Sequence, residues 1–290
     1  MADPYDHLAP AAREVIALPA TERIARMRSR RFAEYPRCRH VLDLMAEQID
    51  RPKGSLKLDL LIWGESGQGK TTIFRKHLRD HPVTSDKATG IRRTPVIGIE
   101  MPPMCDVKWF YTELLRAIDA PPLTGKSDIP LMAERIVHLY RRMDVRQIAV
   151  DEFHNVLMGS PRQQRIMLAV IRNLSNVLEI PLVLFGIQDA REALLHDRQF
   201  ARRFRFVELP TWSPGEEFNA LVGSVLRSLP LRRPSVLTAR AIKALATHSQ
   251  GVTANVFETL VELGVQAIQS EEERITATDV IEWLKRPDAA

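Results

Sequence analysis

The eight residues Gly64-Glu-Ser-Gly-Gln-Gly-Lys-Thr71 constrain the fold of this chain more than any other feature of its sequence. They fit the pattern G-x-x-x-x-G-K-[ST], in which glycines let the backbone curl until successive N–H groups point at a phosphate. The apolar run Leu58–Trp63 predicts a strand directly before the pattern, and a helix is expected from about Lys70 to His81. This strand–loop–helix unit predicts a phosphate-binding site, because the positive end of the helix dipole also faces the loop.

The residue types in the loop indicate a nucleoside triphosphate held with a metal ion. Lys70 can reach the β- and γ-phosphates, and the Thr71 hydroxyl can ligate Mg²⁺. The expected cofactors are therefore ATP and Mg²⁺. The predicted nucleotide-binding residues are Gly64, Glu65, Ser66, Gly67, Gln68, Gly69, Lys70, Thr71 and Thr72.

A second acidic motif follows the apolar run Gln147–Val150, which is expected to be a strand. Ligands of open α/β sheets bind at the carboxyl ends of the strands, and Asp151 and Glu152 stand at that end. Asp151, together with Thr71, is the expected Mg²⁺ ligand, and Glu152 is the candidate general base for an attacking water. The pair therefore favours hydrolysis of ATP to ADP and phosphate.

Short apolar segments alternate with helical patterns from Leu56 to Pro210. This alternation is typical of a parallel sheet covered by helices on both faces, so we expect an α/β fold with a five-stranded parallel sheet. Beyond Pro210 only helical patterns continue, which predicts a small all-helical lid. The expected domains are a basic helical extension (1–52), the nucleotide-binding core (53–210) and the lid (211–290).

Two further side chains are candidates for catalysis. Gln188 follows the apolar run 181–186 and could orient the water or sense the γ-phosphate. The basic segment 197–205 could present an arginine to the site of a neighbouring subunit, with Arg203 as the first choice and Arg202 as the second. An arginine used in this way requires a head-to-tail oligomer. The predicted catalytic residues are Lys70, Asp151, Glu152, Gln188 and Arg203.

The composition fits a protein of the cytoplasm. Two cysteines, Cys38 and Cys105, match no metal or redox spacing, and the first residues lack an apolar signal core. No apolar run reaches the roughly 18–20 residues that cross a bilayer. The formal net charge of +5 permits contact with a polyanion.

The order of these motifs resembles the AAA+ ATPases, and more narrowly the TniB family of transposition ATPases. The resemblance extends over roughly residues 20–285 and is carried by Leu61–Thr72, Asp151–Ser160, Asp197–Phe204, Leu209–Trp212 and Leu229–Ser235. It implies an AAA+ sheet with a helical lid and ATP-dependent assembly of rings or filaments on target DNA. It also implies a DDE transposase as the partner that is recruited or activated. Related regulators of CRISPR-associated transposons and of phage Mu form helical filaments on duplex DNA.

The resemblance also directs attention to basic side chains that face the ring interior in AAA+ proteins. The chain is only 6% aromatic, so phosphate contacts with duplex DNA, largely independent of sequence, fit better than base stacking on a single strand. The arginine-rich segment 23–31 is one candidate for this contact. The others are Lys108, which we rank first, and Arg92, Arg93, Arg162 and Arg165.

Alternatives remain open at this point. The lid segment Gly251–Glu258 has no arginine where many AAA+ proteins carry a second sensor, which suggests slow, regulatory hydrolysis. An AAA+ ATPase of another DNA or signalling system would share most of these features, as would a nucleotide-binding adaptor without useful hydrolysis. A P-loop kinase for a small molecule is opposed by Glu152, by the basic charge and by the helical lid.

Overall fold

The computed structural model describes residues 4–29, 32–52, 58–85, 92–121, 128–196 and 201–286. The chain divides into two compact units. We call the first the helical unit; it comprises Met1–Arg39, Ser66–Gly69 and Pro210–Ala290. We call the second the sheet unit; it comprises His40–Glu65 and Lys70–Leu209. The domain boundaries predicted from the sequence stay predictions.

A five-stranded sheet forms the centre of the sheet unit, and its strand order is β4-β5-β6-β1-β7. All neighbouring strands are parallel, which confirms the predicted fold class. The three inner strands β1, β5 and β6 are almost entirely buried, as expected for apolar strands covered on both faces. The strands are β1 (Asp59–Trp63), β4 (Val96–Glu100), β5 (Gln147–Asp151), β6 (Leu182–Gly186) and β7 (Phe204–Glu208).

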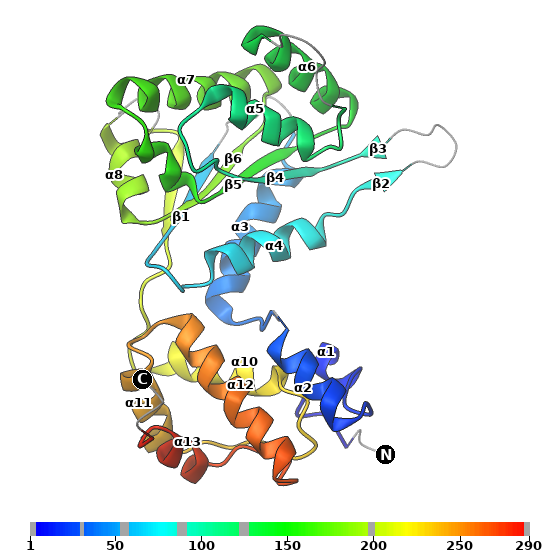
Figure 1. Cartoon of the computed structure of the whole chain (residues 1–290), viewed down its shortest axis with the longest axis vertical. Helices are drawn as coiled ribbons and strands as arrows, with labels where there is room; N and C mark the ends of the chain where they lie inside the picture. The colour runs from blue at the N-terminus through cyan, green and yellow to red at the C-terminus, as the bar shows by residue number, and fades with distance from the viewer. Residues whose placement is uncertain are drawn as a thin grey trace. The chain divides into compact units, whose positions relative to one another are not determined.

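Helices cover both faces of this sheet (Figure 1). One face carries α5 (Val107–Arg116), α6 (Ile129–Arg142) and α7 (Pro161–Leu178). The other face carries α3 (Pro36–Asp50) and α4 (Lys70–Asp80). Two short elements that the sequence did not predict follow the strand ends: the 3₁₀ helix η1 (Phe153–Met158) after β5 and α8 (Gln188–His196) after β6.

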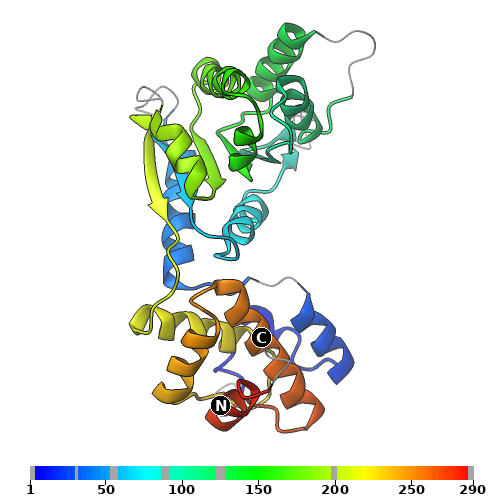
Figure 2. The ribbon, with the colours of Figure 1, turned by 60° about the vertical axis from the view of Figure 1, so that its left-hand side comes forward.

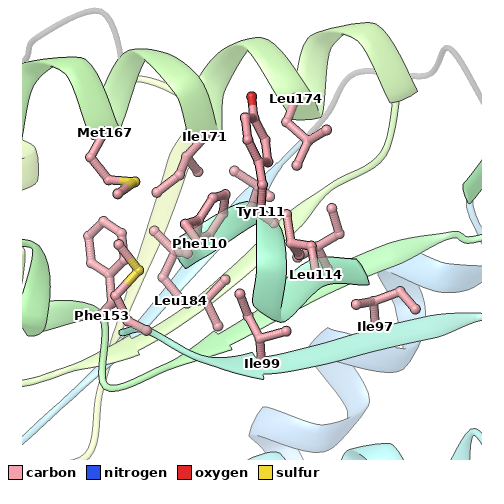
Figure 3. Packing of buried hydrophobic residues seen from close by; sticks show 14 of the residues in the cluster. Ile97, Ile99, Phe110, Tyr111, Leu114, Phe153, Met167, Ile171, Leu174 and Leu184 are labelled. Atoms are coloured by element: carbon pink, nitrogen blue, oxygen red, sulfur yellow. The ribbon is translucent and has the colours of Figure 1, made fainter. Parts of the chain in front are cut away.

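The main hydrophobic core lies between the sheet and α5 and α7 (Figure 3). On α5, Phe110 and Leu114 are four residues apart and therefore point to the same side. On α7, Met167, Ile171 and Leu174 are spaced four and three residues apart and likewise share one side. The 3₁₀ helix is anchored in the same core by Phe153, which is 1% exposed.

The helical unit gathers helices from both ends of the sequence (Figure 2). Within it, α2 packs closely on α12, where a Cβ at Gly264 would lie 2.4 Å from the terminal carbon of Met27. Its helices are α1 (Pro10–Arg13), α2 (Ala20–Arg28), α10 (Glu216–Ser228), α11 (Ala239–His248), α12 (Thr253–Gln269) and α13 (Ala277–Trp283).

Arg23 corrects one expectation about this unit. It is 1% exposed, and its guanidinium donates two hydrogen bonds to the Glu273 carboxylate, at 2.8 and 2.6 Å. A third bond goes to the carbonyl of Pro230. Arg23 therefore holds α2 against the C-terminal helices and is not available to DNA, contrary to the expectation for the cluster 23–31. Residues 30–31 lie outside the described part of the chain.

A buried polar network connects α3, α4 and β5. The amide group of Gln147 donates to the carbonyl of Met45 and to the side chain of Gln48, and its oxygen lies 2.6 Å from Nε2 of His77. Since that oxygen only accepts, Nε2 of His77 carries the hydrogen. Burial of the ring lowers the pKa of His77 from 6.5 to about 4, and the hydrogen bond that His77 donates to Gln147 opposes this change.

The His77 pKa predicts a loss of stability in mild acid. Between pH 6.5 and about 4 the unfolded chain takes up a proton at this side chain that the folded protein does not. The contribution to the free energy of unfolding therefore decreases as the pH falls through this window, by roughly 3 kcal/mol in total. Urea unfolding of wild type and His77→Gln at pH 7 and pH 4.5 would measure it. The variant should lose less stability than wild type, whereas His138→Gln, at an exposed position of α6, should behave as wild type does.

Among the helices of the described residues, none combines the length and the apolar character needed to cross a membrane.

Candidate nucleotide-binding site

The phosphate loop connects β1 to α4, as the sequence predicted. Gly67 and Gly69 have φ angles of +78° and +88°, a backbone conformation that favours glycine. Gly64 is required for a different reason, because a Cβ there would lie 2.4 Å from the carbonyl oxygen of Leu209. The three glycines of the motif thus fit the backbone path that the loop takes.

Lys70 begins α4 and extends back along the loop. Its ammonium group donates to the carbonyl oxygens of Gly64 and Glu65, at 2.7 and 2.8 Å. Burial lowers its pKa, and the charges of Glu152 and Asp151 oppose that change. The ammonium group and both carboxylates therefore act on each other within the sheet unit.

Asp151 is the last residue of β5 and is 1% exposed. Its Oδ1 accepts the N–H of Glu152 at 2.9 Å, and Oδ2 is buried without a hydrogen-bond partner among the described residues. Burial raises the pKa of this carboxyl group, while a hydrogen bond from the Thr71 side chain partly lowers it. A buried carboxylate oxygen next to a threonine hydroxyl is a donor set that suits Mg²⁺, so the residues present fit this metal.

Glu152 follows directly and has a left-handed backbone conformation, with φ +53° and ψ 35°. For a non-glycine residue this conformation is uncommon. Its carboxylate oxygen Oε2 lies 3.3 Å from Nε2 of His154. The sheet unit thus brings together Lys70, Thr71, Asp151 and Glu152.

The central residues of the loop, Ser66–Gly69, belong to the helical unit. The amide of Gln68, which is 2% exposed, donates to the carbonyl of Gly251 at 3.0 Å and accepts from the Thr253 hydroxyl at 2.8 Å. That hydroxyl in turn accepts from the indole N–H of Trp212 at 2.7 Å. The sequence motif marks position 68 as variable, so it gave no signal for this buried chain of hydrogen bonds.

The remaining two catalytic candidates lie at opposite ends of the parallel strands. Gln188, the first residue of α8, is exposed at the carboxyl end of β6 and donates to Glu192 at 3.0 Å. Arg203 precedes β7 at the amino edge, where it donates to Asn176 at 2.7 Å and to Ser175 at 3.1 Å. It also lies 3.3 Å from the buried carboxylate of Asp59.

The neighbouring Arg202 is exposed. The assignment of an arginine finger stays a prediction, and the segment 197–200 lies outside the described residues.

The basic candidates for DNA contact form two groups. Lys108 lies in the first turn of α5 and Arg162 and Arg165 lie in the first turns of α7; all three are exposed. These helix starts are neighbours, because a Cβ at Gly159 would lie 2.6 Å from that of Cys105. Arg92 and Arg93 form β3 and pair with β2 (Thr84–Ser85). Arg92 bonds Asp119, just beyond the other end of α5, at 2.9 Å.

A phosphate loop after the inner strand β1 of this parallel sheet, and an acidic pair after β5, define a P-loop nucleotide-binding protein of the AAA+ class. Within that class the sequence matches the family model described as "Bacterial TniB protein" over residues 23–214. The match covers more than half of the chain, and the protein belongs to the TniB family. No curated protein matches the sequence.

Solved structures of low sequence identity share the fold. The ORC2 protein of Aeropyrum pernix, solved as ADPNP-ADP complexes, is 16% identical with a TM-score of 0.64, over 90% of this chain and 70% of that chain. ORC1 of the same organism, solved in complex with DNA, is 18% identical with a TM-score of 0.58, over 85% and 63%. The Walker-type ATPase paby2304 of Pyrococcus abyssi is 14% identical with a TM-score of 0.55, over 89% and 74%.

Proposed function

We propose that this protein is an ATP-dependent regulator of DNA transposition that assembles on target duplex DNA and recruits or activates a DDE transposase. ATP binding promotes assembly, and slow hydrolysis leads to disassembly. The observation that carries the proposal is the arrangement of Lys70, Thr71, Asp151 and Glu152 around one phosphate loop. Membership of the TniB family supports the transposition role, and a cytoplasmic location is part of the proposal.

The hydrolytic step follows from the chemistry of these side chains. Lys70 binds the β- and γ-phosphates. Thr71 and Asp151 would hold Mg²⁺, which would neutralise phosphate charge. Glu152 takes a proton from a water whose oxygen attacks the γ-phosphorus, and the bond from that phosphorus to the β,γ-bridging oxygen breaks. The products are ADP and inorganic phosphate. Gln188, at the same edge of the sheet, is the candidate for orienting the water.

The DNA-binding surface is proposed at the neighbouring starts of α5 and α7. Lys108, Arg162 and Arg165 place three positive charges there, and each is long enough to reach a DNA phosphate. Such contacts do not depend on the base sequence. This suits a protein that marks a target without reading it. Arg92 and Arg93, at the other end of α5, would extend the contact along the duplex.

Lys108→Ala is expected to weaken DNA binding to a similar extent for all duplex sequences. The loss of one phosphate contact should reduce the slope of log K against log[salt] by about 1. Fluorescence anisotropy with labelled duplexes over a salt series, at saturating ATP analogue, measures both quantities. The matched control is Lys243→Ala, at an exposed position of α11, which should leave the slope as in wild type. An unchanged slope in Lys108→Ala would exclude this surface.

Electron microscopy tests the assembly directly. The protein is imaged with duplex DNA alone, with a non-hydrolysable ATP analogue alone, and with both. Rings or head-to-tail filaments that require both components support the proposal, and assemblies that form equally without nucleotide contradict it. Co-sedimentation of the cognate transposase with these assemblies tests recruitment.

A further inference from the structure

His154 contacts the side chain to which the proposed function assigns the general base. Its Nε2 lies 3.3 Å from Oε2 of Glu152, and both side chains are partly exposed. We infer that His154 is a positioning residue that holds the Glu152 carboxylate in its productive orientation. The inference rests on the proposed hydrolytic function and adds a residue to it.

The backbone around the pair fixes both residues. The N–H of Glu152 donates to Asp151 and its carbonyl accepts from Asn155 at 2.9 Å, which hold the left-handed conformation. Phe153, between the two, is buried in the core of the sheet unit. The Asn155 side chain also donates to the carbonyl of Met101 at 3.0 Å. The imidazole therefore extends from a rigid 3₁₀ turn, as a positioning group should.

The chemistry of the two side chains determines which of them is the hydrogen-bond donor. A carboxylate only accepts hydrogen bonds, so Nε2 of His154 can act only as the donor in this contact. Nδ1 of the same ring is buried and has no hydrogen-bond partner among the residues that the structure describes. Nε2 is thus the ring nitrogen through which His154 contacts Glu152.

The residue that His154 contacts lies at the end of the sheet where the phosphate loop begins. Of the charges that act on the pKa of Lys70, that of Glu152 has the largest effect, ahead of that of Asp151. Glu152 and the phosphate loop follow the carboxyl ends of the parallel strands β5 and β1, so both lie at the same end of the sheet. In many active sites a third side chain orients the catalytic base. Such a side chain raises the rate without binding the substrate.

Three variants test the inference: His154→Ala, His154→Gln and His138→Ala as the control at an exposed site. His154→Ala should lower kcat for ATP by about 10- to 100-fold, since a misplaced base loses its alignment with the water. The KM and the affinity for a non-hydrolysable analogue should stay within about twofold of wild type. His154→Gln, whose amide can donate in place of Nε2, should recover most of the rate.

Glu152→Gln separates the inference from the function on which it rests. If His154 acts through Glu152, adding His154→Ala to Glu152→Gln should not lower the single-turnover rate further. If Glu152→Gln hydrolyses ATP slowly, three results would overturn the inference. They are an unchanged kcat in His154→Ala, a loss of nucleotide affinity in His154→Ala that parallels its loss of rate, and no recovery of the rate in His154→Gln. Wild-type hydrolysis by Glu152→Gln would instead overturn the proposed base, and the inference with it.

Discussion

Lys70→Ala is expected to abolish nucleotide binding at concentrations that saturate the wild type. The lysine ammonium is the charged group of the loop that can reach two phosphates at once. Two charge-assisted hydrogen bonds contribute roughly 3 kcal/mol or more together, which corresponds to a loss of affinity of at least about 100-fold. Titration with a fluorescent ATP analogue measures this directly, and ATP-dependent DNA binding should disappear with it.

The chain offers a matched control in the same helix. Lys76, six residues further along α4, pairs with Asp80. Lys76→Ala removes the same charge from the same helix and should bind the analogue as the wild type does. If Lys70→Ala still bound DNA in an ATP-dependent manner, the phosphate loop could not be the nucleotide site that controls assembly.

Glu152→Gln is expected to bind ATP normally and to hydrolyse it about 100- to 10,000-fold more slowly. The amide keeps the size of the side chain but cannot take a proton from the water. Because hydrolysis is proposed to lead to disassembly, the variant should remain on DNA as an ATP-bound oligomer. Phosphate release and the lifetime of the DNA complex after addition of competitor DNA give the two readouts.

Glu134→Gln, at an exposed position of α6, is the control for the loss of one carboxylate and should match wild type in both assays. One result would contradict this prediction: the wild type hydrolyses almost no ATP, and Glu152→Gln leaves that low rate unchanged. That result would identify a nucleotide-binding adaptor, whose assembly is set by nucleotide exchange and not by hydrolysis.

The parts of the fold that the sequence predicted are those with a strong local signal. The inner strands of the sheet are short, mostly apolar runs, and α4 begins at Lys70, where the loop motif predicts a helix. The spacing of glycines, Lys70 and Thr71 specified the loop because the backbone path admits few other residues. The acidic pair could be placed because it ends a strand whose neighbours are parallel.

The parts that could not be predicted depend on contacts between distant residues or on one unusual backbone angle. Arg23 was expected on a basic surface, but its partner Glu273 is 250 residues away and no local pattern connects them. The contact between Glu152 and His154 is close in sequence, yet it depends on the left-handed conformation at position 152. No helix was predicted at α8, although Ala190 and Leu194 have the four-residue spacing of one buried helix face.

The hydrogen-bonded chain from Gln68 through Thr253 to Trp212 has an evolutionary consequence. Positions 68 and 253 are separated by 185 residues, but they share one buried bond, so neither can change freely while the other stays. A relative with an apolar residue at 253 would leave an amide oxygen buried without a donor, unless position 68 had changed as well. In an alignment of relatives, the variable position of the phosphate loop should therefore covary with the first residue of α12.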